Sequence, residues 1–127
     1  MLKKLRKMLK KQEGFTLVEL MIVVVILGIL AGIGVQQYTT VQERAKGAAH
    51  NANLRIISSA VDMYVMLEGE APESIDDLIN GGYLQEVPDN PFGEDDTSEW
   101  GGPYRLEVEP DDDGTDVITV KPGPYEP

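Results

Sequence analysis

The sequence predicts an α+β protein in which a long amino-terminal α-helix, membrane-spanning in its first half, packs on a small antiparallel β-sheet domain. Three observations predict it. Residues 15–35 form an apolar run with one charged side chain, Glu19. An amphipathic pattern, with apolar residues three or four apart, then continues to about Leu67 and extends the helix. Two short runs with strand periodicity follow, joined by an acidic turn.

The apolar run of residues 15–35 is long enough to cross a bilayer, since helical residues rise about 1.5 Å each and 20 of them span roughly 30 Å. Six of the 11 basic side chains precede it, whereas 21 of the 22 acidic side chains follow Gly14. The positive-inside rule keeps the basic segment in the cytoplasm and places the acidic remainder outside. A secretory signal peptide is the alternative, but the apolar run is longer than a signal core and no small-x-small cleavage site follows it. A simple single-pass anchor stays open.

Glu19 requires a partner, because a carboxylate within a membrane segment costs roughly 2.5 to 3.5 kcal/mol on insertion scales. If the chain is cut between Gly14 and Phe15, the new amino group lies four residues before Glu19, one helical turn away. Its positive charge can then neutralise the carboxylate within one chain or between chains. The cut would leave five basic and 21 acidic side chains, a charge of −16.

Residues 14–19, Gly-Phe-Thr-Leu-Val-Glu, follow a short basic leader and precede the apolar run. In this they resemble the processing signal of type IV prepilins and type II secretion pseudopilins. The resemblance implies the pilin fold, a cut after Gly14 by prepilin peptidase, methylation of Phe15, and pairing of Glu19 with a neighbour's amino terminus. It also implies the partners: further copies in a helical homopolymer, minor pilins, an inner-membrane assembly platform, and membrane lipid before assembly.

The sequence departs from the family pattern at Gln36, near which many members carry a proline. Gly28, Gly32 and Gly34 supply weak helix positions instead, each costing about 1 kcal/mol relative to alanine. We therefore expect local bending or melting near Gly32 and Gly34. Gly28 and Gly32 also match the small-residue spacing of close helix contacts in membranes. The alternative is that these glycines only fill crowded positions.

The remaining elements follow from local signals. The long helix should end near Glu68, before Gly69, and a short helix should follow over about residues 74–80 with Ser74 as its cap. Alternating apolar residues predict strands at 104–109 and 117–120, with residues 110–115 as the turn. The predicted organisation is a cleaved leader (1–14), a membrane and filament-core helix (15–35), its amphipathic continuation (36–67), a small α+β region (68–121) and an extended tail (122–127).

The second part of the chain is similar to major pseudopilins of type II secretion, through Tyr83-Leu84, Val87-Pro88, the run from Asn90 to Gly93, and Pro103-Tyr104. Asn90 stands where the family usually has Asp, and Phe92 where it has Trp. Gram-positive competence pilins have a comparable order of elements. An extended pilus, a secretion pseudopilus and a DNA-uptake fibre all stay open.

Clustered carboxylates between the two predicted strands are the candidate metal ligands. Hard cations such as calcium favour such oxygen donors, and major pseudopilins bind calcium near this part of the fold. A calcium site at Asp111, Asp113 and Asp116 is therefore one interpretation, and we favour a solvated acidic hairpin loop. His50 has no neighbour that suggests catalysis or zinc binding, so we expect it to be solvated.

Phe92 and Trp100 lie in turn-rich sequence, and we expect them to plug the domain.

Composition narrows the function. The chain contains no cysteine, which excludes disulfides, thiolate metal sites and cysteine nucleophiles. The acidic balance argues against direct nucleic-acid binding, because phosphate contacts need clustered Lys and Arg. We therefore expect a structural subunit without enzymatic activity or a required cofactor, which passes from the cytoplasmic membrane into a periplasmic or cell-surface filament. The rival hypothesis is a membrane-tethered binding module that does not polymerise.

Overall fold

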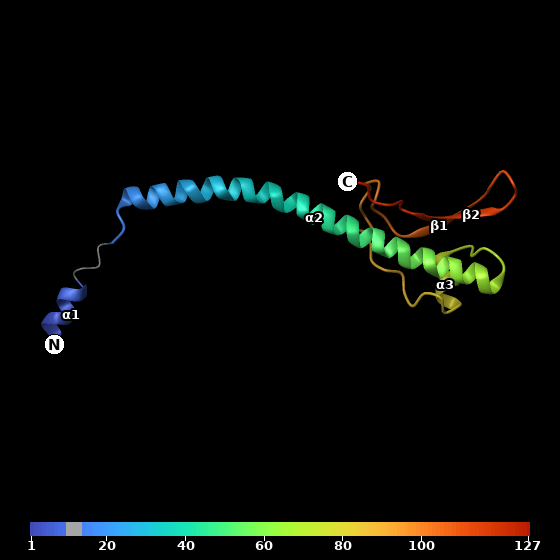
Figure 1. Cartoon of the computed structure of the whole chain (residues 1–127), viewed down its shortest axis with the longest axis horizontal. Helices are drawn as coiled ribbons and strands as arrows, with labels where there is room; N and C mark the ends of the chain where they lie inside the picture. The colour runs from blue at the N-terminus through green and yellow to red at the C-terminus, as the bar shows by residue number, and fades with distance from the viewer. Residues whose placement is uncertain (10–13) are drawn as a thin grey trace. The chain divides into compact units, whose positions relative to one another are not determined.

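The computed structural model describes residues 1–9 and 14–127 of the chain. Its elements, in order, are α1 (Leu2–Leu9), α2 (Leu17–Glu68), α3 (Ile75–Asn80), β1 (Arg105–Pro110) and β2 (Asp116–Lys121) (Figure 1). The chain forms two compact units, Met1–Thr40 and Val41–Pro127, and α2 continues through the boundary between them. The α+β class predicted from the sequence is confirmed.

Helix α2 has the extent that the sequence predicts. It ends at Glu68, and Gly69 follows with a φ of 77°, a left-handed conformation that stops helices at low cost only for glycine. Its first residue is Leu17, two residues after the predicted start of the apolar run. The helix is unbroken at Gly32 and Gly34.

Helix α1 covers most of the basic leader, where the sequence interpretation assigned no secondary structure. Leucine and lysine are strong helix formers, which is the local signal for this helix. The side chains of Leu2 and Leu5 are exposed. Residues 10–13, which include Lys10 and Lys11 of the predicted leader, lie outside the described residues.

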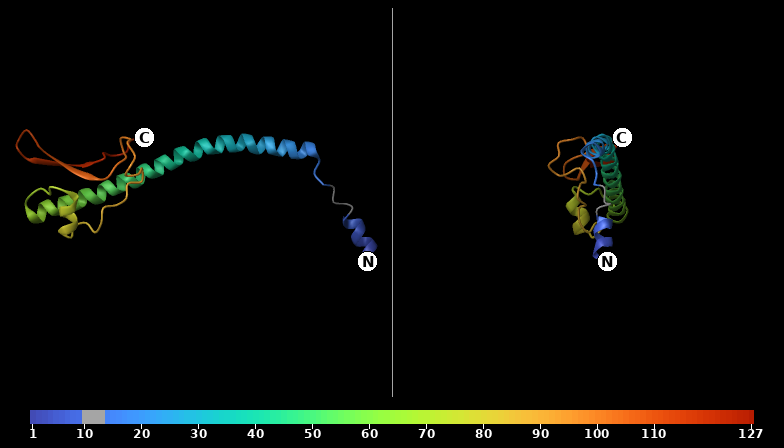
Figure 2. Two further views of the ribbon diagram at one scale, coloured as in Figure 1. Left: turned by 180° about the vertical axis from the view of Figure 1, so that it is seen from behind. Right: turned by 90° about the vertical axis from the view of Figure 1, so that its left-hand side faces the viewer.

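Within the unit Val41–Pro127, α3 and the β1–β2 hairpin lie beside the last part of α2 (Figure 2). Helix α3 begins where predicted, because the Asp77 carboxylate accepts hydrogen bonds from the backbone N–H groups of Glu73 and Ser74, at 2.9 and 3.1 Å. The backbone N–H groups of Tyr83 and Leu84 then donate to the carbonyl of Leu78, which returns the chain to the core.

The two strands pair in antiparallel register, with Leu106 opposite Val120 and Val108 opposite Ile118. Both strands lie within a residue or two of their predicted positions. Their shared apolar face is covered only in part: Leu106, Ile118 and Val120 pack against the core, whereas Val108 is exposed. Residues 111–115 form the turn, closed by a 2.7 Å hydrogen bond from Asp111 N–H to the Thr115 carbonyl.

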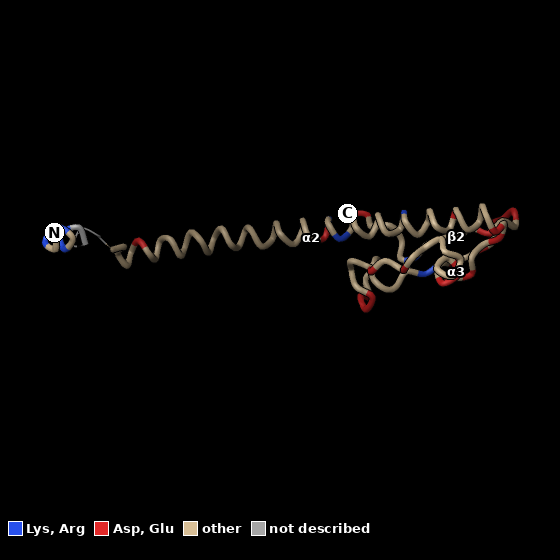
Figure 3. Tube along the Cα trace, turned by 90° about the horizontal axis from the view of Figure 1, so that it is seen from below, with Lys and Arg blue, Asp and Glu red and all other residues tan. Residues whose placement is uncertain are grey.

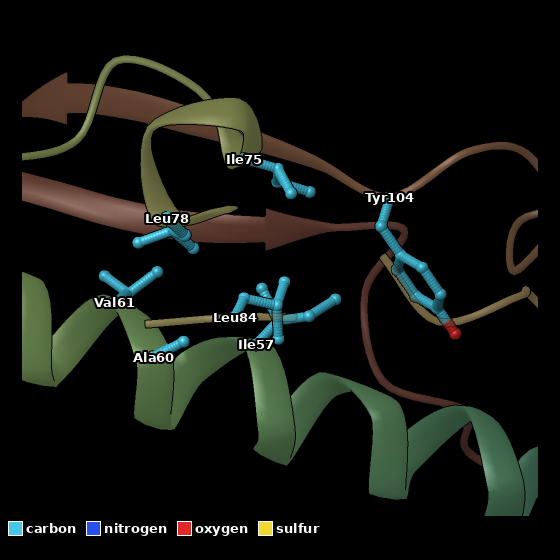
Figure 4. Packing of buried hydrophobic residues seen from close by; sticks show 7 residues of the cluster. All are labelled: Ile57, Ala60, Val61, Ile75, Leu78, Leu84 and Tyr104. Carbon is cyan, nitrogen blue, oxygen red and sulfur yellow. The ribbon is translucent and has the colours of Figure 1, made fainter. Parts of the chain in front are cut away.

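The core joins α2, α3 and the residues before β1 (Figure 4). Ile57 and Leu78 belong to this cluster and have no exposed surface. The buried hydrophobic residues of this cluster are Ile57, Ala60, Val61, Ile75, Leu78, Leu84 and Tyr104. Burial of these side chains is the main apolar contribution to the stability of this unit, at about 1.5 to 3 kcal/mol for each large one.

The prediction that His50 is solvated is wrong. Its side chain has no exposed surface, and both ring nitrogens are hydrogen-bonded, Nδ1 to the Tyr104 hydroxyl and Nε2 to the Gly123 carbonyl. Helical spacing places His50 at the margin of the apolar face, and distant segments of the chain cover that margin. A local pattern does not reveal such a cover.

Candidate processing and assembly site

The predicted cleavage site lies in irregular backbone. Gly14, Phe15 and Thr16 form neither helix nor strand, and the side chain of Phe15 is 88% exposed. Apart from its neighbours in the chain, no atom of the described residues lies within 4 Å of a Cβ built on Gly14. The fold itself therefore gives no steric reason for a glycine here, and the peptide bond after it is open to an enzyme.

Thr16 and Glu19 form a reciprocal cap at the start of α2. The backbone N–H of Thr16 donates to Glu19 Oε2 at 3.3 Å, and the backbone N–H of Glu19 donates to Thr16 Oγ1 at 3.2 Å. This is the capping-box arrangement, which satisfies two backbone donors that a helix start otherwise leaves free. The sequence interpretation gave Thr16 no role, although the spacing Thr-x-x-Glu is the known signal for this cap.

In the part of the chain that the structure describes, the carboxylate of Glu19 accepts one hydrogen bond, from the Thr16 N–H, and has no ion-pair partner. Among residues 1–9 and 14–127, the one ion pair joins Arg105 and Glu107 on the hairpin, at 3.4 Å. Glu19 also lies in the first turn of α2, where the positive end of the helix dipole favours an anion by about 0.3 to 1 kcal/mol. A cationic partner would therefore add a charge pair to a side chain that already has one backbone hydrogen bond and a favourable place at the helix start.

Within α2, residues 20–35 carry only apolar side chains and glycine, so this stretch is apolar on all sides. The most apolar window of 18 residues in α2 has a mean hydropathy of 2.7, and none of that window is buried within the chain. In the part of the chain that the structure describes, α2 alone is long and apolar enough to cross a membrane. Figure 3 shows one acidic position near the start of α2 and no basic position along its first half.

Gly28 and Gly32 face open space in the single chain. Beyond the adjoining turns of α2 itself, a Cβ built on either would meet no atom of residues 1–9 or 14–127 within 4 Å, and the same is true at Gly34. Packing within the chain therefore does not explain these glycines. Close approach of another helix remains the explanation that their spacing predicts.

The structure does not bring the predicted calcium ligands together. Asp111, Asp113 and Asp116 are all exposed, and Asp111 Oδ1 instead accepts a 2.7 Å hydrogen bond from the backbone N–H of Asp112. Across residues 1–9 and 14–127, no three His, Asp or Glu side chains are arranged to hold a metal ion. Calcium needs six to eight oxygen ligands at 2.3 to 2.6 Å, so the loop as placed does not fit the ion.

Phe92 and Trp100 pack together beside α2, outside the main core cluster. Their ring centroids are 5.9 Å apart, and each ring also meets Tyr125, at 5.6 and 4.8 Å. The expectation that they plug the domain is met in part, since both are half-buried at its edge. The sequence interpretation did not connect Tyr125 with them.

Comparison with known proteins finds the same motif at the start of the chain. Residues 9–35 match the family model described as the prokaryotic N-terminal methylation motif. The chain is 32% identical to type II secretion system core protein G of Vibrio cholerae, in an alignment that covers 90% of this chain and 83% of that protein. The chain belongs to the family of type II secretion system core protein G.

Other members of the core protein G family show the same level of similarity. The proteins of Aeromonas hydrophila and Pseudomonas aeruginosa are 31% and 32% identical to the chain. Each alignment covers 76% of this chain and 73% of the relative. No solved structure was found to match the chain.

Proposed function

We propose that this chain is a structural, non-enzymatic subunit of a type II secretion pseudopilus, assembled through the first half of α2. One observation carries the proposal: an 18-residue window of mean hydropathy 2.7, no part of which is buried by the rest of the chain. Water cannot be its environment at acceptable cost, because fully burying one such side chain is worth about 1.5 to 3 kcal/mol. Lipid covers this surface before assembly, and copies of the same helix cover it afterwards.

The precursor is cut between Gly14 and Phe15 by prepilin peptidase, and the new amino terminus is methylated. The exposed, irregular backbone at this bond supports the assignment, because a protease needs an extended and accessible substrate. Until the cut, the leader keeps its basic side chains on the cytoplasmic face and the acidic unit stays outside. The mature subunit then enters a periplasmic filament.

The cut also changes the electrostatics of the helix start. It removes six basic side chains and creates an amino group one residue before Thr16. Glu19 gives up its hydrogen bond from Thr16, or shares it, and pairs with the amino group of a neighbouring subunit. Because one such pair forms at each subunit contact, it sets the axial register of the helices.

The other proposed partners follow from the same cycle. Prepilin peptidase acts on the leader, an inner-membrane assembly platform receives the mature subunit, and minor pilins accompany it in the filament. Gly28 and Gly32 allow close contact between neighbouring helices, consistent with their open surroundings in the single chain.

The test is electron microscopy of filaments sheared from cells that produce the chain together with its peptidase and assembly platform. An antibody against the acidic unit should decorate them along their length. Cells without the peptidase are the control and should yield none. If the processed chain is abundant in the membrane but no decorated filament forms under any level of production, the chain is a membrane-tethered binding module instead.

A further inference from the structure

Residues 123–125 lie against α2, where the side-chain amide of Asn51 forms hydrogen bonds with the backbone of Tyr125. Asn51 Nδ2 donates to the Tyr125 carbonyl at 3.1 Å, and the Tyr125 N–H donates to Asn51 Oδ1 at 2.8 Å. One side-chain amide thus satisfies both backbone groups of one residue, as a neighbouring strand would. Such a contact recognises extended backbone whatever side chain it carries.

His50, one residue earlier, holds the same segment. Its Nε2 lies 2.8 Å from the Gly123 carbonyl, which can only accept, so in the neutral ring Nε2 carries the hydrogen. Nδ1 then accepts from the Tyr104 hydroxyl, also at 2.8 Å. Burial raises the pKa of that hydroxyl, opposed by a hydrogen bond from Asn53, so Tyr104 stays protonated and can donate.

The ring of Tyr125 occupies a pocket that a glycine creates. A Cβ built on Gly47 would overlap the ring, so any other residue at this helix position would displace it. Phe92 stacks on the ring and Trp100 meets it edge-on. These three aromatic residues also line an open cavity of about 270 Å³. Gly47 lies in the interior of α2, where glycine is less favourable than alanine for helix stability. Packing of the Tyr125 ring against this position offsets that cost.

We propose that Gly47, His50 and Asn51 of α2, together with Phe92 and Trp100, form a binding site for an extended peptide that carries an aromatic side chain. Residues 123–125 are its ligand, supplied by the same chain. Hydrogen bonds from His50 and Asn51 hold the peptide backbone, and the pocket over Gly47 selects the ring.

The ligand segment suits this role. Pro122 and Pro124 flank Gly123, and proline restricts the backbone to extended conformations, so less entropy is lost on docking. Docking places Tyr125 between α2 and the two aromatic residues of the 89–102 loop. The segment therefore fastens that loop to the helix. Docking of this segment does not depend on filament formation, because all of its contacts lie within one chain.

The test compares the full-length chain in detergent with the same chain shortened after Lys121. A synthetic peptide of residues 122–127 is then added to the shortened chain. Trp100 is the one tryptophan of the chain, so its fluorescence reports on the site alone. We expect shortening to shift Trp100 emission to longer wavelength and to lower Tm. The peptide should reverse both changes saturably, with half-saturation in the millimolar range because the tether's effective concentration is lost. The same peptide with Tyr125→Ala should not.

Two full-length variants keep the proposal testable if the shortened chain does not fold. Gly47→Ala should shift Trp100 emission and lower Tm, although alanine is the better helix former. Gly34→Ala is the matched control, because its added Cβ meets open space and no aromatic ring. Unchanged Trp100 emission together with a raised Tm in Gly47→Ala would overturn the proposal, as would equal restoration by the two peptides.

Discussion

The substitution Glu19→Ala should act in opposite directions on the membrane form and the filament form of the subunit, because the carboxylate destabilises the first and stabilises the second. In the membrane, the substitution removes a charge from an apolar helix, which lowers the insertion cost by up to about 2.5 to 3.5 kcal/mol. It also removes the acceptor for the Thr16 N–H and the favourable contact with the helix dipole, at about 0.3 to 1 kcal/mol. The membrane form should therefore gain up to about 2 to 3 kcal/mol.

The same substitution destabilises the filament, because it removes the charge pair between Glu19 and the amino group of a neighbouring subunit. A carboxylate and an amino group about 4 Å apart attract by about 4 kcal/mol at an effective dielectric constant of 20. Stabilising the membrane form by about 2 to 3 kcal/mol shifts its equilibrium with the filament by a factor of roughly 30 to 150. Loss of the pair adds to this shift, so we expect sheared filaments to fall at least 100-fold.

Sheared filaments and membrane-retained chain are both measured by immunoblot, with processing followed from the change in mass. Glu19→Gln is the matched variant, since glutamine retains an oxygen that can accept from the Thr16 N–H but carries no charge. Both variants should be processed, stay in the membrane and fail to assemble. Normal filaments from Glu19→Gln would refute the charge pairing and leave the cap as the only role of this side chain.

Three further predictions concern processing, stability and calcium. Gly14→Ala should leave the leader attached, seen as a larger product on immunoblots, and removal at the normal rate would exclude this cleavage site. Leu78→Ala should destabilise the chain by about 2 to 5 kcal/mol in denaturant unfolding, because the side chain is fully buried, whereas Leu67→Ala, 73% exposed, should change stability by less than about 1 kcal/mol. Millimolar calcium should leave Tm unchanged, because the hairpin carboxylates are not gathered; a rise in Tm that Asp111→Asn together with Asp113→Asn abolishes would instead establish the site.

Elements that depend on neighbouring residues could be predicted from the sequence. The end of α2 follows from Gly69, the start of α3 from Ser74 and Asp77, and the hairpin from alternation around a short acidic turn. The apolar run and its single carboxylate predict the membrane segment and the assembly helix in the same way. Thr16 belongs to this class too, since its cap spans three residues, and the Thr-x-x-Glu spacing was sufficient to find it.

The sequence by itself therefore determined the family, the processing motif and the order of the elements from α2 onward, because each depends on spacing along a few turns of chain. Only the tertiary structure decided which segments cover His50 and Asn51 at the margin of the apolar face of α2. His50 bonds to residues 54 and 73 positions away, and Asn51 to one 74 positions away. Helical periodicity shows that such a residue lies on one face, but the partner on that face is set by how distant segments pack. For that reason a histidine expected in solvent is buried, and a tail expected only to be extended is bound.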